Sequence, residues 1–192
     1  MAASSRVEHV EGDLLTIDTQ YICHQTNCRS GKGLGLAKIL FERFPHANVY
    51  AERRPFVKGT QYSVPGTIEV RGHGPGPDNR GVINLMGQDA GGPCKRKGQR
   101  EARAEYFALG LSAIAALDDL TSIAFPHNIG CGIAGGHWPD YLAMIEAFAD
   151  ARPDVRVVIV SLPKAKQQAW AGVLEQQKRE AGYRVKGDRR RR

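Results

Sequence analysis

Four glycines lie between residues 128 and 136, in a stretch that contains no lysine, arginine or acidic residue. Because glycine lacks a Cβ atom and readily adopts positive φ, neighbouring backbone N–H groups in such a stretch can converge on one point. The stretch connects a strand-like apolar segment at 122–125 to a helix-like segment that begins at Trp138. A loop that ends at a helix N-terminus suits anions. These residues therefore predict a site that holds a phosphate through the main chain alone.

Another glycine-rich loop follows the strand-like segment at 21–25 and contains Gly31, Gly33 and Gly35. It is called the first glycine loop because it comes earlier in the chain, and the stretch at 128–136 is the second glycine loop. This loop also leads into a helix-like segment. Ligands of open α/β sheets bind at the carboxyl ends of the strands, so we expect both loops and the segment 84–88 at one edge of the sheet. A ligand with two phosphates would fit between the two loops.

Two common nucleotide-binding motifs fit this sequence poorly. A P-loop needs a Ser or Thr directly after its lysine to hold Mg²⁺, but Gly33 follows Lys32. The glycine spacing of dinucleotide-binding loops does occur at Gly130, Gly132 and Gly135, but late in the chain. These departures disfavour a P-loop site and a hydride-transferring enzyme.

The four cysteines show no spacing typical of a zinc site: they are Cys23, Cys28, Cys94 and Cys131. A disulfide at Cys131 would block the second glycine loop, so we expect free thiols and a reducing compartment, the cytoplasm. No apolar run approaches the ~20 residues of a membrane span, and the N-terminus lacks the apolar core of a signal peptide. We expect no metal, no cofactor, no membrane contact and a monomeric chain.

Strand-like and helix-like segments alternate along the chain. Short apolar runs, several of them β-branched, predict strands buried on both faces at 7–10, 21–25, 67–70, 81–86, 122–125 and 156–161. Apolar residues at helical spacing predict helices at 36–44, 100–117, 138–149 and 164–181. This alternation predicts an α/β fold, a three-layer α/β/α sandwich around a mixed, mostly parallel central sheet.

The formal net charge of +7 is concentrated at one end of the chain. Residues 184–192 hold six basic residues and one acidic residue, and thus +5 of this charge. We expect one domain over 1–183 and a basic, disordered tail at 184–192. A weak contact between this tail and nucleic acid is an alternative to a purely solvated end.

Several short segments resemble, in their order along the chain, the motifs of one protein family. They lie at 11–15, 26–27, 33–37, 83–85, 123–126 and 129–132. Together they resemble the macrodomains over residues 7–162, and most closely the branch of the yeast-type ADP-ribose 1″-phosphate phosphatases and the terminal ADP-ribose glycohydrolases. The resemblance implies the macrodomain fold and a ligand that is ADP-ribose or a molecule carrying it.

The resemblance also implies a set of binding residues. In this family pattern, Asp13 accepts a hydrogen bond from the adenine amino group, Leu14 offers its main chain beside it, and Asn27 contacts the distal ribose. The two glycine loops hold the diphosphate and the distal ribose. The implied residues are Asp13, Leu14, Asn27, Gly33, Leu34, Gly35, Leu36, Gln88, Asn128, Gly130, Cys131, Gly132, Ile133, Ala134 and Gly135.

Three side chains are candidates for catalysis. His24 stands where many macrodomains carry an asparagine, and its ordinary pKa suits proton transfer in either direction. The alternative for His24 is a structural histidine at the end of a strand. Asn27 and Lys32 complete the candidate set, and Lys32 is equally compatible with a solvated surface position.

Two positions depart from one branch of the family, which uses a lysine nucleophile and an acidic residue. The corresponding positions here are Gln88 and Ala134, and neither can act as an amine nucleophile or a carboxylate base. We therefore expect a metal-independent hydrolase in which water attacks directly, removing a 1″-phosphate or an ADP-ribosyl ester from the distal ribose. The alternative is a module that binds ADP-ribose without turning it over.

Overall fold

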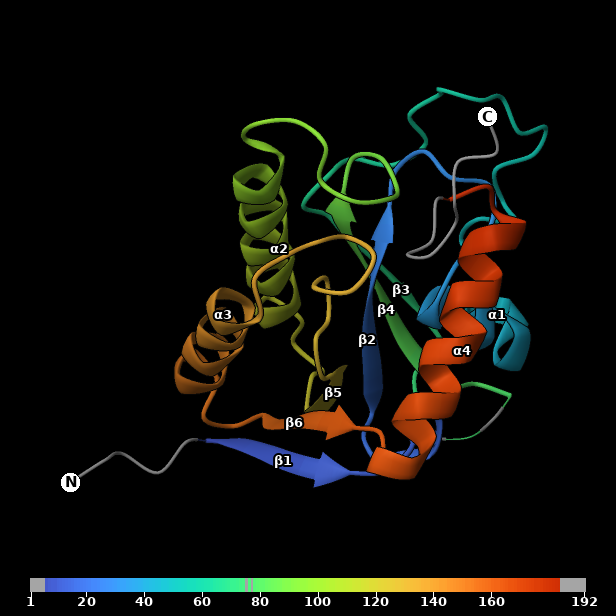
Figure 1. Cartoon of the computed structure of the whole chain (residues 1–192). Coiled ribbons are helices and arrows are strands. Elements are labelled where there is room, and N and C mark those ends of the chain that lie inside the picture. The colour runs from blue at the N-terminus through green and yellow to red at the C-terminus, as the bar shows by residue number, and fades with distance from the viewer. Residues whose placement is uncertain (1–5, 75, 77, 184–192) are drawn as a thin grey trace, which may run out of the picture.

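The chain forms a six-stranded sheet covered by helices on both faces, as Figure 1 shows. The computed structural model describes residues 6–183 except 75 and 77, and the predicted tail at 184–192 lies outside these residues. The elements follow in the order β1 Val7–Glu11, a 3-10 turn at Leu14–Thr16, β2 Tyr21–Asn27, α1 Leu36–Arg43, a 3-10 turn at Pro45–Ala47, β3 Ile68–Arg71, β4 Gly81–Gln88, α2 Gln99–Ala115, β5 Ser122–Pro126, α3 Trp138–Ala151, β6 Arg156–Ser161 and α4 Lys164–Glu180.

The order of strands across the sheet is β1-β6-β5-β2-β4-β3. The first five of these strands run parallel, and β3 alone pairs antiparallel with its neighbour β4. The predicted mixed, mostly parallel sheet is therefore confirmed. Because the parallel strands share one direction, the loops after β1, β2, β5 and β6 reach the same edge of the sheet.

Each face of the sheet has its own hydrophobic core. Alternate residues of a strand point to opposite faces, so Ile123 of β5 packs with α2 and α3, whereas Ala124 packs on the α1 side. Phe107 of α2 and Ile145 of α3 fill the first core, and Leu40 of α1 belongs to the second. The short, continuously apolar strands are thus buried on both faces, as in a three-layer sandwich.

Most predicted boundaries agree with the structure to within two residues, and β2 shows the difference that matters for function. This strand continues past Gln25 to Asn27, with an irregularity in its pairing to β4 between these two residues. His24 consequently lies inside the strand, opposite Asn84 of β4. The helix predicted to start at Arg100 begins at Gln99, where Gly98 precedes it in the left-handed conformation.

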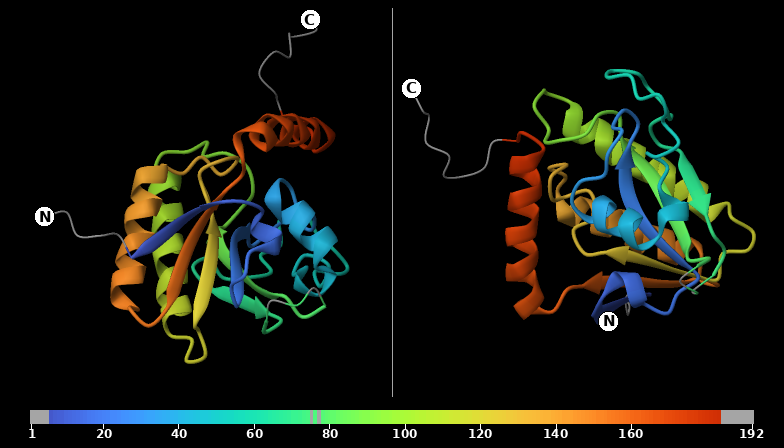
Figure 2. Two further views of the ribbon diagram at one scale, coloured as in Figure 1. Left: turned by 90° about the horizontal axis from the view of Figure 1, so that it is seen from below. Right: turned by 90° about the vertical axis from the view of Figure 1, so that its right-hand side faces the viewer.

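Helix α4 is placed differently from the other three helices. It follows β6 directly and stands apart from the layers of the sandwich in both views of Figure 2. No residue of α4 belongs to either hydrophobic core in the part of the chain that the structure describes.

Candidate functional site

A cleft of about 670 Å³ opens at the carboxyl edge of the sheet. Its walls come from the segments after β1, β2, β5 and β6 and from one side of α4. A volume of this size is typical of sites for small-molecule ligands. The cleft therefore lies where the topology of an open α/β sheet predicts a ligand.

Most of the predicted binding residues line this cleft. They are Asp13, Leu14, Leu34, Gly35, Leu36, Gln88, Asn128, Gly130, Gly132, Ile133 and Ala134, and the catalytic candidate His24 lies with them. Asp13 also accepts a hydrogen bond from the backbone N–H of Leu15 through Oδ1, at 3.0 Å. This contact caps the short 3-10 turn that begins at Leu14.

Other predicted residues lie outside the cleft lining. Lys32 and Gly33 line a separate cavity of about 290 Å³, together with Lys38 and Arg54. Cys131 and Gly135 belong to the second loop, but neither lines the cleft.

Asn27 is buried and fixes the start of the first loop. Its side-chain oxygen accepts hydrogen bonds from the N–H groups of Arg29 and Ser30, at 3.1 and 2.8 Å. Its Nδ2 donates to the hydroxyl of Tyr50 at 3.0 Å. Arg53 donates to the carbonyls of Asn27 and Ser30 and lies over the Tyr50 ring. The polar atoms of Asn27 thus hold the loop in place.

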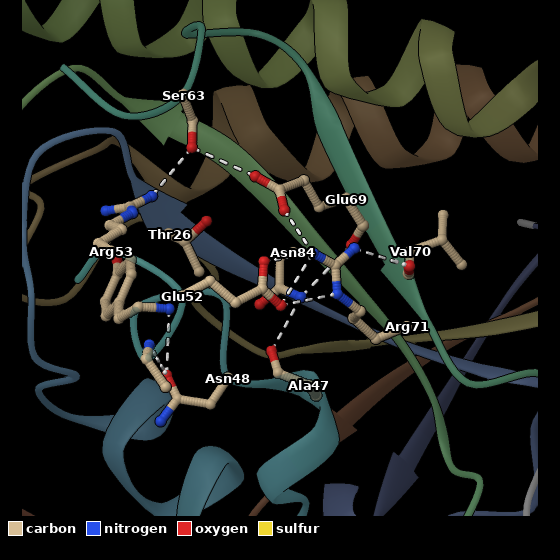
Figure 3. Close-up of polar contacts among 12 residues, drawn as sticks. Thr26, Ala47, Asn48, Glu52, Arg53, Ser63, Glu69, Val70, Arg71 and Asn84 are labelled. Carbon is tan, nitrogen blue, oxygen red and sulfur yellow. Dashed lines mark hydrogen bonds and ion pairs between the residues drawn. The ribbon is translucent and has the colours of Figure 1, made fainter.

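His24 is fully buried in β2, against the ring of Phe41. Its Nε2 lies 2.7 Å from Oδ1 of Asn84. The Nδ2 group of Asn84 donates to two backbone carbonyls, those of Ala47 and Glu69, as Figure 3 shows. Because carbonyls only accept, Oδ1 of Asn84 must face the histidine, and Nε2 of His24 carries the hydrogen.

The other ring nitrogen of His24, Nδ1, then carries a lone pair and has no hydrogen-bond partner among the described residues. Burial lowers the pKa of His24 to about 4, and the hydrogen bond with Asn84 offsets only part of this shift. His24 is therefore neutral at pH 7. Its Nδ1 is an acceptor enclosed beneath the cleft surface.

The second glycine loop requires glycine at the point where it packs against side chains of β2 and α3. Gly130 has φ +70°, and a Cβ atom there would lie 2.5 Å from Oε1 of Gln25 and 2.5 Å from the ring of Tyr141. Asn128 also adopts a positive φ of 62°. Close packing and left-handed backbone thus set the path of this loop.

Arg103 of α2 joins this loop to the segment after β4. It is buried and donates to the carbonyls of Ala134, Gly92 and Ala90. Sequence reasoning missed Arg103, because an arginine in an amphipathic helix is normally a solvated surface residue. No local signal reveals that three distant carbonyls meet it.

Sequence reasoning also missed part of the cleft wall. Gln25 and Ser161 line the cleft, and so do Trp170 and Leu174 of α4. The last two form an apolar pair at i and i+4 on a mostly polar helix, a signal in the sequence that this face of α4 is covered.

Among the described residues, the acidic and basic side chains that line the cleft are Asp13, His24 and His127. Burial and the nearby His9 lower the pKa of His127, which also contacts the side chain of Asn128. Residues 6–183, apart from 75 and 77, contain no group of three or more His, Cys, Asp or Glu side chains able to hold a metal ion. No helix within the same range is long and apolar enough to span a membrane.

No protein-family model matches this sequence, and no curated protein matches it either. Solved structures do match its fold. The macrodomain of Mycobacterium tuberculosis DarG is 24% identical, with a TM-score of 0.61 over 82% of this chain and 98% of that one. The macrodomain of Thermus aquaticus DarG is also 24% identical, with a TM-score of 0.55 over 82% and 97%.

A Trypanosoma brucei macrodomain in complex with ADP-ribose is 14% identical to this chain, with a TM-score of 0.56 over 89% of this chain and 68% of that one. At these identities, what is shared is the arrangement of strands and helices around the sheet. The chain has the macrodomain fold.

Proposed function

We propose that this chain binds ADP-ribose, free or attached to another molecule, in the cleft at the carboxyl edge of the sheet. The observation that carries this proposal is the convergence of Asp13 and both glycine loops on one cleft of about 670 Å³. Two structures with the same fold contain ADP-ribose, the Trypanosoma brucei macrodomain and an Oceanobacillus iheyensis macrodomain variant.

In the proposed complex, Asp13 lies at the adenine end. Its Oδ1 caps the turn at Leu15, so its second carboxylate oxygen is available to accept from an exocyclic amino group. The loops that contain Gly35 and Gly132 supply N–H groups to the diphosphate. The distal ribose lies toward Gln88 and Ala134.

The binding experiment is calorimetric titration with ADP-ribose of the wild-type chain, Asp13→Asn and a control, Asp18→Asn. The asparagine at 13 retains an oxygen for Leu15, but it places an amide donor opposite the adenine amino group. We expect Asp13→Asn to weaken binding about tenfold, and Asp18→Asn, an exposed residue, to leave it unchanged. Absence of ADP-ribose binding by the wild-type chain would contradict the proposal.

A second proposed function is hydrolysis at the distal ribose, and the lone pair on Nδ1 of His24 favours it. Water would form a bond to the carbon, phosphorus or carbonyl centre under attack while the bond to the leaving oxygen breaks, and the leaving oxygen would take up the proton that the water loses. Because Nδ1 is enclosed in this structure, His24 would accept the hydrogen bond of that water after a local shift that opens Nδ1 to the cleft. A pKa of about 4 makes His24 a weak base, so its contribution would be to orient the water more than to deprotonate it.

The test for hydrolysis compares ADP-ribose 1″-phosphate with protein carrying ADP-ribosyl esters on acidic residues. The variant His24→Gln keeps a donor for Asn84 but removes the Nδ1 acceptor. We expect it to lose turnover and to keep ADP-ribose affinity within severalfold. If the wild-type chain releases neither phosphate nor ADP-ribose, the chain is a binding module and the hydrolase proposal fails.

A further inference from the structure

Helix α4 lies across the loops that form the proposed ADP-ribose cleft. Its first turn is tied to the end of β6 by a hydrogen bond of 2.7 Å from Gln167 to the carbonyl of Leu162. Farther along, Trp170 and Leu174 line the cleft. Figure 2 shows the helix standing apart from the sheet layers, so these contacts and those of its last turns attach it to the rest of the protein.

Gln177 makes the contact that matters most. It is the one buried residue of α4 among those that the structure describes. Its Oε1 accepts a hydrogen bond of 2.7 Å from the backbone N–H of Gly35. A backbone N–H can only donate, so the oxygen of the carboxamide, and not its nitrogen, must face Gly35.

Gly35 is the residue that immediately precedes α1, and it lines the cleft. Its N–H therefore belongs to the set of donors that the first glycine loop can offer to an anion. In this structure a neutral side chain from the same chain occupies that donor.

Side chains from α4 and from the second glycine loop both lie close to Gly35. Methyl groups of Leu174 from α4 and Ile133 from the second loop each lie 3.5 Å from the position that a Cβ of Gly35 would take. Beyond the helix, the ring of Tyr183 lies 3.1 Å from the corresponding position at Gly92. Helix α4 is thus a strap that contacts the first loop, and Tyr183, just beyond the helix, reaches the segment after β4.

We propose that Gln177 competes with a ligand phosphate for the N–H of Gly35, so that binding in the cleft releases the second half of α4. This inference rests on the proposed function, because it concerns the regulation of the same site. A phosphate oxygen is a stronger acceptor than a neutral carboxamide, so the ligand displaces Gln177. Because binding must break the Gln177 contact, this contact lowers the observed affinity for the ligand. Equally, the bound ligand weakens the docking of Gln177 on Gly35.

The experiment measures the affinity for ADP-ribose and, separately, for inorganic pyrophosphate by calorimetric titration. The variants are Gln177→Ala, which removes the competitor, and Gln177→Glu, which keeps an acceptor and adds a negative charge. Gln176→Ala is the matched control, because Gln176 is the exposed neighbour and its side chain contacts only Glu180 among the described contacts.

We expect Gln177→Ala to bind both probes about fivefold more tightly, the size of one net hydrogen bond. Gln177→Glu should bind more weakly than wild type, and Gln176→Ala should match wild type. Amide hydrogen exchange should also show faster exchange in residues 170–180 when ADP-ribose saturates the wild-type chain. A scaffolding role for Gln177 predicts the opposite order, with weaker binding by Gln177→Ala, and that order would overturn the inference.

The two probes separate this inference from the proposed function. If ADP-ribose does not bind but pyrophosphate binds more tightly to Gln177→Ala than to wild type, the ADP-ribose proposal fails and the competition stands. If ADP-ribose binds equally well to wild type and to Gln177→Ala, the competition fails and the ADP-ribose proposal stands. If neither ADP-ribose nor pyrophosphate binds to any variant, both the ADP-ribose proposal and the competition are overturned.

Discussion

At the scale of single residues, the cleft depends on which glycines are enclosed and which are open. Gly130 and Gly132 are two positions apart in the same loop, yet their surroundings differ. A Cβ atom at Gly130 would meet Gln25 and Tyr141 at 2.5 Å, whereas a Cβ atom at Gly132 would meet nothing within 4 Å. Only the first position combines positive φ with close packing.

We therefore predict that Gly130→Ala lowers the free energy of unfolding by about 1–3 kcal/mol, because it adds both backbone strain and overpacking. Gly132→Ala is the control and should change the free energy of unfolding by about 0.5 kcal/mol or less. Urea unfolding of the two variants and the wild-type chain measures both values. Equal destabilisation by the two substitutions would contradict this account of the loop.

His24 links its burial to the pH dependence of stability. The unfolded chain binds a proton at the ordinary histidine pKa of about 6.5, whereas the folded chain binds it only near pH 4. Between these two values the unfolded state holds more protons, so acidification favours unfolding. Stability from the neutral His24 is complete above pH 6.5 and is lost as the pH falls toward 4.

We predict that His24 alone costs the wild-type chain about 3 kcal/mol of unfolding free energy between pH 6.5 and pH 4. The variant His24→Gln lacks this proton and should lose correspondingly less over the same range. Urea unfolding at several pH values checks this difference. Parallel pH profiles for the two proteins would show that His24 does not titrate as its burial implies.

At the scale of elements, α2 supports the site although it contributes no residue to the cleft lining. Arg103, on its first turns, holds the carbonyls of Ala90, Gly92 and Ala134. Arg100, one turn earlier, is exposed and, within the part of the chain that the structure describes, donates to the carbonyl of Gly135. The two arginines make a matched pair for testing how the segment after β4 and the second glycine loop are held together.

We predict that Arg103→Met lowers the free energy of unfolding by about 2–4 kcal/mol, because it leaves buried carbonyls without a donor. The same substitution should weaken ADP-ribose binding, because the second loop loses its anchor at Ala134. Arg100→Met should cost less than about 1 kcal/mol, since its partner can bond to water. Chemical unfolding and calorimetric titration of both variants provide the measurements.

Helix α4 is peripheral to the sandwich. None of its described residues joins either hydrophobic core, and its contacts run to loops through Trp170, Leu174 and Gln177. We predict that a chain ending at Pro163 still unfolds in one cooperative transition, with a free energy lower by about 1–3 kcal/mol from the lost apolar contacts and hydrogen bond. Loss of cooperative unfolding in this truncated chain would refute a peripheral role for α4.

At the scale of the whole molecule, ligand binding and global stability are linked, because the cleft exists only when segments far apart in the sequence meet at one sheet edge. The unfolded chain has no such convergence and should not bind ADP-ribose. We predict that ADP-ribose at one hundred times its dissociation constant raises the free energy of unfolding by about 2.7 kcal/mol. Thermal and urea unfolding with and without the ligand test this, and adenosine at equal concentration is the control.

Much of this architecture could be predicted from the sequence, because local patterns encode it. The apolar run of β6 predicts that this strand is buried, and so does the helical spacing of Phe107, Leu111 and Ile114 for one face of α2. Glycine at positions 35 and 130 is compatible with positive φ, which the backbone adopts at both positions. Both patterns extend over only a few residues, so the α/β sandwich and the positions of its two glycine loops could be predicted from the sequence.

The tertiary structure alone decided which of these residues work together. His24 owes its neutral state to burial and its tautomer to Asn84, 60 positions away, and Gln177 meets Gly35 from 142 positions away. Lys32 and Gly33 line a cavity separate from the cleft. Desolvation and hydrogen bonding between distant segments depend on the assembled fold, and no local pattern of residue types records them.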